Sequence, residues 1–202
     1  MSLLVAADAP TLVVVSHPRA DSLTRAALDR VLAGLEHAGA PVELLDLDAE
    51  GFDPVLTLEE RRGHLTHTPA DRPELVPHIE ALQGARRLVL VYPTWFGGQP
   101  ARLKGWFDRV WMNEVAFDLP PGADRLRPRL RNLREIHVVT THGSPRWINA
   151  VQGNPGKMRL FRAMRNTCHP LCRPRWTALY DLDSLDRSEI EAWLDRVERR
   201  FG

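Results

Sequence analysis

The sequence predicts an α/β fold in which helices cover both faces of a parallel sheet. Five short apolar runs, rich in Val, Leu and Ile, alternate along the chain with segments whose apolar residues have helical spacing. Strands that alternate with helices pair in parallel and are joined by right-handed crossovers. The 202 residues are enough for one such domain with a full core, so a single domain over residues 1–202 is expected.

The chain begins with a predicted strand, a helix and a second strand. Residues 11–16 are a continuous apolar run, which is typical of a strand that is buried on both faces. Ser22 is a favourable N-cap for the helix that follows. The apolar residues of this helix are Leu23, Ala26, Ala27, Val31 and Leu35. Residues 42–47 form the second strand, in which apolar and acidic side chains alternate.

Residues 51–73 are predicted to form a long polar excursion, because glycine and proline recur along them. One short helix is expected near residues 58–65, and the charged side chains there are interpreted as a solvated face. These side chains are Glu59, Glu60, Arg61 and Arg62. A helix over residues 74–82, a third strand over residues 87–92 and a helix over residues 100–111 follow.

The second half of the chain adds two strands and two helices. Residues 117–134 are rich in proline and are predicted to be irregular. Strands are predicted over residues 135–141 and 176–182, and helices over residues 154–166 and 188–200. The periodicity alone does not separate the possible strand orders of a doubly wound sheet.

A loop with two aromatic side chains lies between the third strand and the next helix. Pro93 ends the strand, Trp95 and Phe96 follow, and Gly97 allows the backbone to turn sharply and approach a ligand. Open α/β sheets bind ligands at the carboxyl ends of their strands. Flat rings stack on aromatic side chains. The loop therefore indicates a site for a flat aromatic ligand, and the alternative is a helix start that only packs in the core.

This segment closely resembles the flavin-binding loop of the flavodoxin-like NAD(P)H:quinone oxidoreductases. The shared positions are Pro93, Trp95, Phe96, Gly97, Pro100, Ala101, Leu103, Lys104, Gly105, Trp106, Asp108, Arg109 and Val110. One extra residue precedes Pro100, because Gly98 and Gln99 both stand there. The resemblance implies a flavodoxin-like three-layer sandwich with a five-stranded parallel sheet of strand order 2-1-3-4-5.

The loop after the first strand is a candidate phosphate site, because it leads into a helix N-terminus with free N–H groups. His17, Ser22 and Thr24 add donors, and Arg19 adds charge. The resemblance implies that His17, Arg19, Ser22 and the backbone amide of Leu23 hold the flavin phosphate. The alternatives are an ordinary N-cap for Ser22 and a loop histidine bonded to a carbonyl for His17. Neither a Walker motif nor a G-x-G-x-x-G motif is present.

The other two loops would hold the flavin ring. The resemblance implies contacts from Pro93, Thr94, Trp95, Phe96 and Gly97, with backbone amides near Trp95 meeting the ring edge. It also implies contacts from the loop after the fourth strand, which consists of Thr140, Thr141, His142 and Gly143.

His142 stands where the family has a glycine, and the family's tyrosine and histidine are replaced by Ile148 and Asn154. His142 is therefore the candidate catalytic residue, which would stabilise negative charge on the reduced flavin. The alternative is a surface loop histidine. Trp147 is expected to fill space over the ring.

The resemblance implies a flavin-dependent NAD(P)H oxidoreductase. Hydride would pass from NADH or NADPH through bound FMN, or FAD, to a quinone or another small-molecule acceptor. FMN is favoured, because FAD-binding relatives often have a longer C-terminal region. A homodimer is expected, and Trp106, Val110 and Trp111 are expected to provide apolar surface for it.

Three other functions are alternatives. A flavodoxin-type electron carrier is usually strongly acidic, whereas this chain has a net charge of +1. A flavin-binding regulatory subunit of a membrane transport system is compatible with the sequence. A phospho-receiver would need acidic residues where Ser16 and His17 stand.

Composition excludes several further classes. The net charge and the absence of a basic arm argue against nucleic-acid binding. No apolar run reaches the ~20 residues of a membrane span, and the first ten residues lack the basic start of a signal peptide. Two cysteines in a chain of this size favour a cytoplasmic location. Cys168 and Cys172 are expected to be buried thiols, because they and His169 are too few ligands for zinc.

Overall fold

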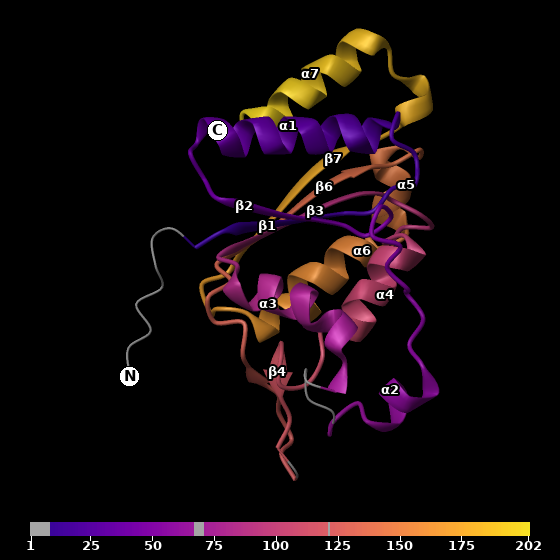
Figure 1. Cartoon of the computed structure of the whole chain (residues 1–202). Helices are drawn as coiled ribbons and strands as arrows, with labels where there is room; N and C mark the ends of the chain where they lie inside the picture. Colours follow the sequence, from indigo (N-terminus) through magenta and orange to yellow (C-terminus); the bar gives the residue numbers. More distant parts are fainter. Residues whose placement is uncertain (1–8, 67–70, 121) are drawn as a thin grey trace.

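The computed structural model describes residues 9–66, 71–120 and 122–202. Five parallel strands form one sheet in the order β2-β1-β3-β6-β7, which is 2-1-3-4-5 among these five strands along the chain (Figure 1). The flavodoxin-like strand order is therefore confirmed. The strands are β1 (Thr11–Val15), β2 (Val42–Asp46), β3 (Arg87–Pro93), β6 (Glu135–Thr141) and β7 (Arg173–Leu179).

Helices cover both faces of this sheet, so the molecule has three layers (Figure 1). One face carries α1 (Leu23–His37) and α7 (Arg187–Glu198), and the other carries α3 (Val76–Gly84) and α4 (Ala101–Val110). The small helix α6 (Pro155–Met158) also lies on the second face.

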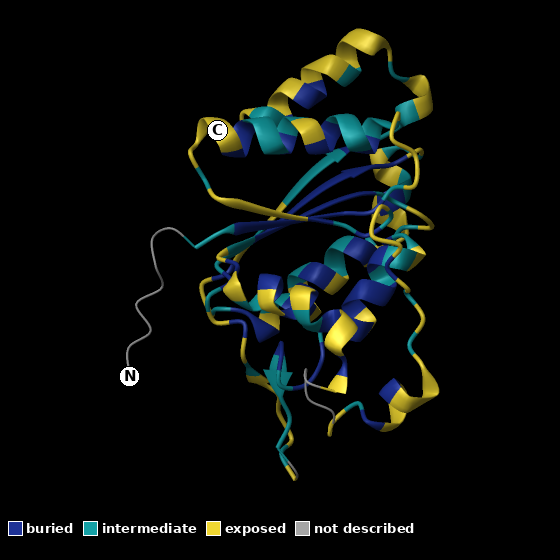
Figure 2. Cartoon of the chain, viewed as in Figure 1, coloured by how far each residue is buried: buried dark blue, intermediate teal, exposed yellow. Residues whose placement is uncertain are grey.

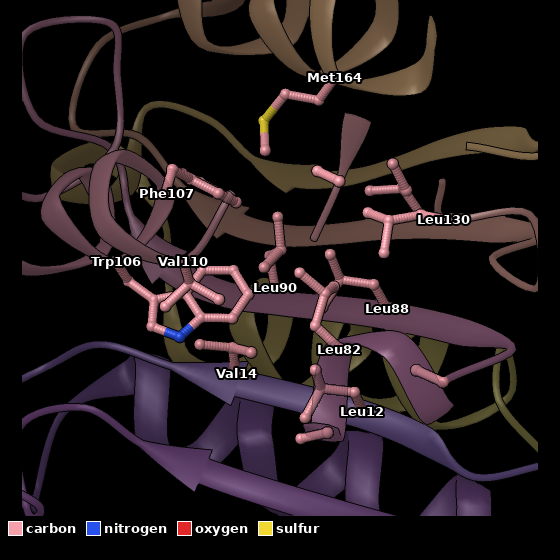
Figure 3. Packing of buried hydrophobic residues seen from close by; sticks show 14 of the residues in the cluster. Leu12, Val14, Leu82, Leu88, Leu90, Trp106, Phe107, Val110, Leu130 and Met164 are labelled. Atoms are coloured by element: carbon pink, nitrogen blue, oxygen red, sulfur yellow. The ribbon is translucent and has the colours of Figure 1, made fainter. Parts of the chain in front are cut away.

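Successive strand residues point to opposite faces, so β1 contributes to two separate cores. Val13 and Val15 pack against α1 and α7, whereas Leu12 and Val14 pack on the other side. Figure 3 shows this second core, where Trp106 of α4 lies near Val14. Figure 2 shows the central strands as buried, and β2, at the sheet edge, is largely exposed. The continuous apolar runs of the sequence therefore mark the strands that are covered on both faces.

The fifth strand is displaced by three residues from its predicted position. It was expected over residues 176–182, and the structure places β7 at Arg173–Leu179. Its first residues are Arg, Pro and Arg, which are typical of a loop. They nevertheless pair with β6, because Arg173 lies in register with Glu135 at the open amino end of the sheet. Side chains at a strand end reach solvent, so the apolar pattern did not mark this start.

The predicted helix over residues 154–166 is present but irregular. It begins as α6, continues as a π-helical turn over Arg159–Ala163 and ends as a 3-10 turn over Met164–Thr167. A separate short helix, α5 (Arg146–Val151), was not predicted. Its side chains are mostly exposed and show no apolar stripe, so periodicity could not reveal it.

The irregular stretch over residues 117–134 also contains structure that the sequence did not show. Two-residue strands, β4 (Phe117–Asp118) and β5 (Arg127–Pro128), pair antiparallel outside the main sheet. Strands this short lack a detectable alternating pattern.

Glu60 was wrongly placed on a solvated face. It lies in α2 (Leu58–Arg62) and is 5% exposed. Its carboxylate accepts a hydrogen bond of 2.8 Å from Nε of Arg109, and Nη1 of Arg72 lies 3.9 Å away. The partners of Glu60 are far away in sequence, so the local run of charges gave no sign of the buried pair. Arg109 therefore fixes the excursion of residues 51–66 to α4.

Trp106 and Val110 do not provide a surface for dimerisation. Both side chains are fully buried in the core of the single chain, and Trp111 packs against that core. The part of the shared motif that lies in α4 thus packs in the core of the single chain. Gly105 belongs to it for the same reason, because a Cβ there would lie 2.3 Å from Cα of Pro54.

Other expectations concern the cysteines and the membrane. Cys168 and Cys172 are buried free thiols, as predicted. Among the described residues, no helix is both long enough and apolar enough to span a bilayer. The expectation about a signal peptide concerns residues that lie mostly outside the described part of the chain.

Candidate functional site

Three loops meet at the carboxyl edge of the sheet, because they follow the adjacent strands β1, β3 and β6. The N–H of Ser16 donates to the carbonyl of Val91 at 3.1 Å, and the N–H of Thr94 donates to that of Thr141 at 2.8 Å. Helix α5 lies at this same edge (Figure 1). The three loops singled out from the sequence are therefore neighbours in space.

The first loop ends in a capped helix. Oγ of Ser22 accepts a hydrogen bond from the N–H of Arg25 at 3.3 Å and donates to the carbonyl of Arg19 at 3.0 Å. Nδ1 of His17 lies 3.1 Å from the N–H of Arg19. The first N–H groups of α1 have no intrahelical partner, and the first turn holds no acidic side chain. This N-terminus can therefore accept an anion.

Two residues of this loop are less available than the sequence indicated. The guanidinium of Arg19 forms an exposed ion pair with Asp21 at 2.8 Å. Thr24 is only 3% exposed, so its side chain belongs to the interior. The free donors of the loop are thus mainly backbone N–H groups.

The second loop is a tight hairpin turn. The N–H of Trp95 donates to the carbonyl of Gly98 at 3.0 Å, and the N–H of Gly98 donates back at 2.8 Å. Phe96 and Gly97 between them have φ values of 44° and 74°, as in a type I′ turn. Phe96 is fully exposed and Trp95 is 62% exposed. A non-glycine residue with positive φ is strained, and such strain clusters at functional sites.

A second layer supports this turn. The N–H of Gly156 donates to the carbonyl of Gly97 at 2.9 Å. Gln99 is buried and its Nε2 donates to the Tyr92 hydroxyl at 3.3 Å and to the carbonyl of Gly156 at 3.4 Å. Burial raises the pKa of Tyr92, which therefore stays neutral. Sequence reasoning did not predict this support. The only sign of it was the extra residue before Pro100, because Gln99 is one of the two residues that stand there.

The third loop is joined to the second by side chains. Oγ1 of Thr94 lies 2.9 Å from Oγ1 of Thr140 and 3.3 Å from Nε2 of His142. Thr140 and Thr141 are buried, whereas Gly143 is exposed. The structure therefore brings Thr94, Thr140 and His142 into one hydrogen-bonded group.

His142 is 5% exposed, so it is not a surface loop histidine. Its ring stacks on Tyr180 with a centroid distance of 4.5 Å and an interplanar angle of 22°. Burial lowers the pKa of His142, and the side chain of Asn149 opposes this change only in part. Nδ1 has no hydrogen-bond partner among the described residues. A neutral imidazole suits a donor or acceptor role better than that of a fixed positive charge.

Trp147 adds a third exposed aromatic side chain at this edge. It lies on α5 and is 67% exposed. The positions where the family has its tyrosine and histidine hold Ile148, which is half-buried, and Asn154, which has a φ of 47° before α6. Exposed aromatic faces are suited to stacking on a flat ring.

The aromatic loops form an open platform. Three cavities, of about 600, 650 and 580 Å³, lie elsewhere on the described surface, and none is lined by Trp95, Phe96 or Trp147. The last of them adjoins the first loop and includes Pro18 and Asp46. Within the described ranges, no group of three or more His, Cys, Asp or Glu side chains could hold a metal ion.

Comparisons with known proteins extend this picture. The chain is 36% identical over 104 residues to the uncharacterised NAD(P)H oxidoreductase YcaK of Escherichia coli, which is 52% of this chain and 53% of that protein. It is 26% identical over 165 residues to NAD(P)H dehydrogenase (quinone) 1 of Cavia porcellus, covering 74% of this chain and 59% of that protein. The chain thus spans between half and three fifths of the length of these relatives.

The structure of Smu.1420 from Streptococcus mutans superimposes with a TM-score of 0.79 and 26% identity, over 95% of this chain and 98% of that one. A family model described as flavodoxin-like fold matches residues 9–199. The family match and the observed strand order together show that this chain belongs to the family with the flavodoxin-like fold.

Proposed function

We propose that this chain is a flavin-dependent NAD(P)H oxidoreductase that binds FMN at the carboxyl edge of its sheet. It takes hydride from NADH or NADPH and reduces a quinone or a similar small molecule. The observation that carries this proposal is the meeting of a free helix N-terminus, an exposed aromatic turn and the Thr94 group at one edge. Similarity to NAD(P)H oxidoreductases and to a quinone dehydrogenase supports it.

The first loop would hold the flavin phosphate. Ser22 fixes the helix start, and the backbone N–H groups of Leu23 and Thr24 face the anion. His17 adds a ring N–H. Arg19 contributes once it leaves Asp21, and such an exposed ion pair is easily exchanged.

The second and third loops would hold the ring. In the described turn, the N–H groups of Phe96 and Gly97 are not used by internal hydrogen bonds, so they are free to donate to a ring edge. Stacking comes from Trp95 and the neighbouring aromatics, with contacts from Pro93, Thr94, Thr140, Thr141 and Gly143. When it is bound, the flavin supplies the hydride chemistry, and the protein orients the reactants and tunes the cofactor.

His142 acts in this proposal through Thr94. Either Nε2 of His142 or Oγ1 of Thr94 is the donor of the shared hydrogen bond, depending on the histidine tautomer. The chain has Ile148 and Asn154 where the family has a tyrosine and a histidine. Stabilisation of negative charge therefore falls on the loop N–H groups and on the Thr94–His142 pair.

A homodimer in the cytoplasm is also part of the proposal. Phe96, Trp147 and Val151 are exposed at the flavin edge, and a second copy could cover them. Burial of such apolar area stabilises association. The cytoplasm is proposed because both cysteines are free thiols.

Flavin titration and turnover test the proposal together. Saturable quenching of flavin fluorescence at micromolar FMN is expected, followed by flavin-dependent oxidation of NADPH or NADH with a quinone. The mass of the cofactor released from purified protein distinguishes FMN from FAD. Absence of saturable quenching would contradict flavin binding. Quenching without turnover would favour the electron carrier or the regulatory subunit of a transport system.

A further inference from the structure

A row of arginines crosses the amino end of the sheet, at the edge opposite to the proposed flavin site. Arg86 and Arg134 directly precede β3 and β6, and Arg173 begins β7. The N–H of Arg134 donates to the carbonyl of Arg86 at 2.8 Å, and the N–H of Arg173 donates to that of Arg134 at 2.9 Å. Adjacent strands are about 4.8 Å apart, so the three backbone positions lie close together at this end of the sheet. Arg86 and Arg134 lie at one level, and Arg173 lies one residue further along, in register with Glu135.

The charges of these three arginines have no local compensation. Among the described residues, none of their side chains makes an ion pair or a hydrogen bond. The neighbouring Glu135 is already engaged, because it lies 3.4 Å from Arg87 and 3.1 Å from Arg175. Like charges directly opposite each other on adjacent strands are destabilising, and Arg86 and Arg134 directly precede the paired residues Arg87 and Glu135. The row therefore lacks a structural explanation and would be stabilised by an anion.

A cavity of about 600 Å³ opens at this row. Its lining includes Arg86, Arg134 and Arg173, together with the small apolar side chains of Ala38 and Ala40. Arg87 and Glu135, which pair with each other, also line it. The volume lies within the range of small-molecule sites. Guanidinium groups bind phosphate oxygens in a bidentate manner, so several adjacent arginines suit a ligand with more than one phosphate.

We propose that this cavity binds a small soluble anion that carries two or more phosphate groups. A nucleic acid is disfavoured, because the net charge of the chain is +1 and the basic residues gather around one hollow. The cavity lies at the end of the strands opposite to Trp95 and Ser22, where Figure 1 shows the chain entering β1. The inference is thus independent of flavin binding.

His169 provides a native reporter of this site. Its pKa lies below the ordinary value because of partial burial and the positive charges of Arg134 and Arg131. An anion bound at Arg134 would offset that positive charge. The pKa of His169 should therefore rise when the cavity is occupied, and NMR of the imidazole protons would show it.

Calorimetry with inorganic pyrophosphate at low ionic strength tests the proposal. The variants are Arg134→Gln, Arg173→Gln and Arg134→Lys, and the control is Arg62→Gln, an exposed arginine of α2 without a described ion pair. One site per chain is expected. Loss of one charge-assisted pair should weaken binding about tenfold in the two glutamine variants at Arg134 and Arg173. Arg134→Lys should have an intermediate affinity, because it keeps the positive charge and loses the bidentate geometry of the guanidinium.

The result that supports the proposal is saturable binding that these variants weaken and Arg62→Gln does not, with a rise in the pKa of His169. No heat of binding in the wild-type protein would overturn it. Equal weakening by Arg62→Gln would indicate general electrostatic attraction and would also overturn it. Competition between pyrophosphate and FMN would place the anion at α1 instead, and a flavin titration that fails while pyrophosphate binds would contradict only the proposed function.

Discussion

Oγ1 of Thr94 lies 3.3 Å from Nε2 of His142, and this contact joins the loop after β3 to the loop after β6. Thr140 extends the group, because its hydroxyl lies 2.9 Å from that of Thr94. The face of the His142 ring stacks on Tyr180. A change at His142 would therefore be transmitted to the aromatic turn through Thr94.

His142→Ala should slow the reduction of bound flavin by NAD(P)H and leave flavin affinity nearly unchanged. Loss of one donor that stabilises charge commonly costs ~10²-fold, and a smaller effect is expected here because the loop N–H groups remain. Stopped-flow bleaching of the flavin absorbance measures this rate.

Thr94→Val provides the matched test, because it removes the same hydrogen bond from the other side. The double variant should be no slower than the slower of the two single variants, since residues that act as a unit are not additive. If His142→Ala bleaches as fast as wild type, His142 has no catalytic role. If the effects multiply, His142 does not act through Thr94.

Gly97→Ala should distort the aromatic turn. A Cβ at this position would lie 2.9 Å from Cγ of Pro155, and the φ of 74° already disfavours any side chain. Left-handed backbone costs about 1–2 kcal/mol for a non-glycine residue, and the clash adds to this cost. Flavin affinity should fall together with the free energy of unfolding, which urea denaturation measures.

Gly39→Ala is the control that separates the cost of the left-handed backbone from the cost of the clash. Gly39 has a φ of 63°, and a Cβ there would meet nothing within 4 Å. It should lower stability by the backbone cost alone and leave flavin affinity unchanged. Equal behaviour of the two variants would mean that α6 does not hold the turn in place.

The centre of the sheet could be predicted because β1, β3 and β6 are buried on both faces. Residues 135–141 show this clearly, since the observed β6 has the predicted bounds. The order of the strands came from the resemblance of residues 93–110 and not from periodicity. The start of β7 was missed because Arg173 lies at the open end of the sheet, where burial does not constrain the sequence.

The loops of the site could be located, but their contacts could not. The pair of Thr94 and His142 arises from residues 48 positions apart. The support of Gly97 by Gly156 likewise depends on tertiary packing. Spacing reveals which residues share an element, whereas these contacts require the elements to be placed in space.

Glu60 should make stability depend on pH. Burial raises its pKa, but the N–H of Thr57 and the guanidinium of Arg109 more than offset burial, so the pKa lies below its ordinary value. The folded carboxylate binds fewer protons than the unfolded one. Its contribution is therefore complete above the unfolded pKa of about 4.3 and is lost as the pH falls through the folded pKa.

Glu60→Ala tests this pair at neutral pH. Removal of one partner from a buried ion pair costs about 3–5 kcal/mol, and the lower end is expected here because Arg109 keeps its contact of 3.0 Å with the exposed Glu74. The exposed neighbour in Glu59→Ala should change stability by about 0.5 kcal/mol or less. Urea denaturation at several pH values measures both variants. A Glu60→Ala variant with the same acid-dependent slope as wild type would remove Glu60 from this role.

Val151→Glu should disrupt the proposed homodimer. Val151 is 81% exposed on α5 at the flavin edge, so the change should not disturb the fold of one chain. A charge placed in an interface is costly when it has no partner. Light scattering at tens of micromolar should show a dimer for wild type and a monomer for the variant. The control is Leu171→Glu, since Leu171 is 72% exposed at the opposite edge. A monomeric wild-type protein would contradict the dimer.

Trp95→Ala should weaken flavin binding, whereas Trp176→Ala should lower the stability of the fold. Trp95 is 62% exposed, so its loss should leave stability nearly unchanged and remove stacking of about 1 kcal/mol, which is about fivefold in flavin affinity. Trp176 is half-buried within β7 and contacts Phe161 edge-on at 6.1 Å. Its loss should lower the free energy of unfolding by about 3 kcal/mol. Flavin fluorescence titration and urea denaturation of both variants distinguish binding from folding. Unchanged affinity in a folded Trp95→Ala variant would remove Trp95 from the site.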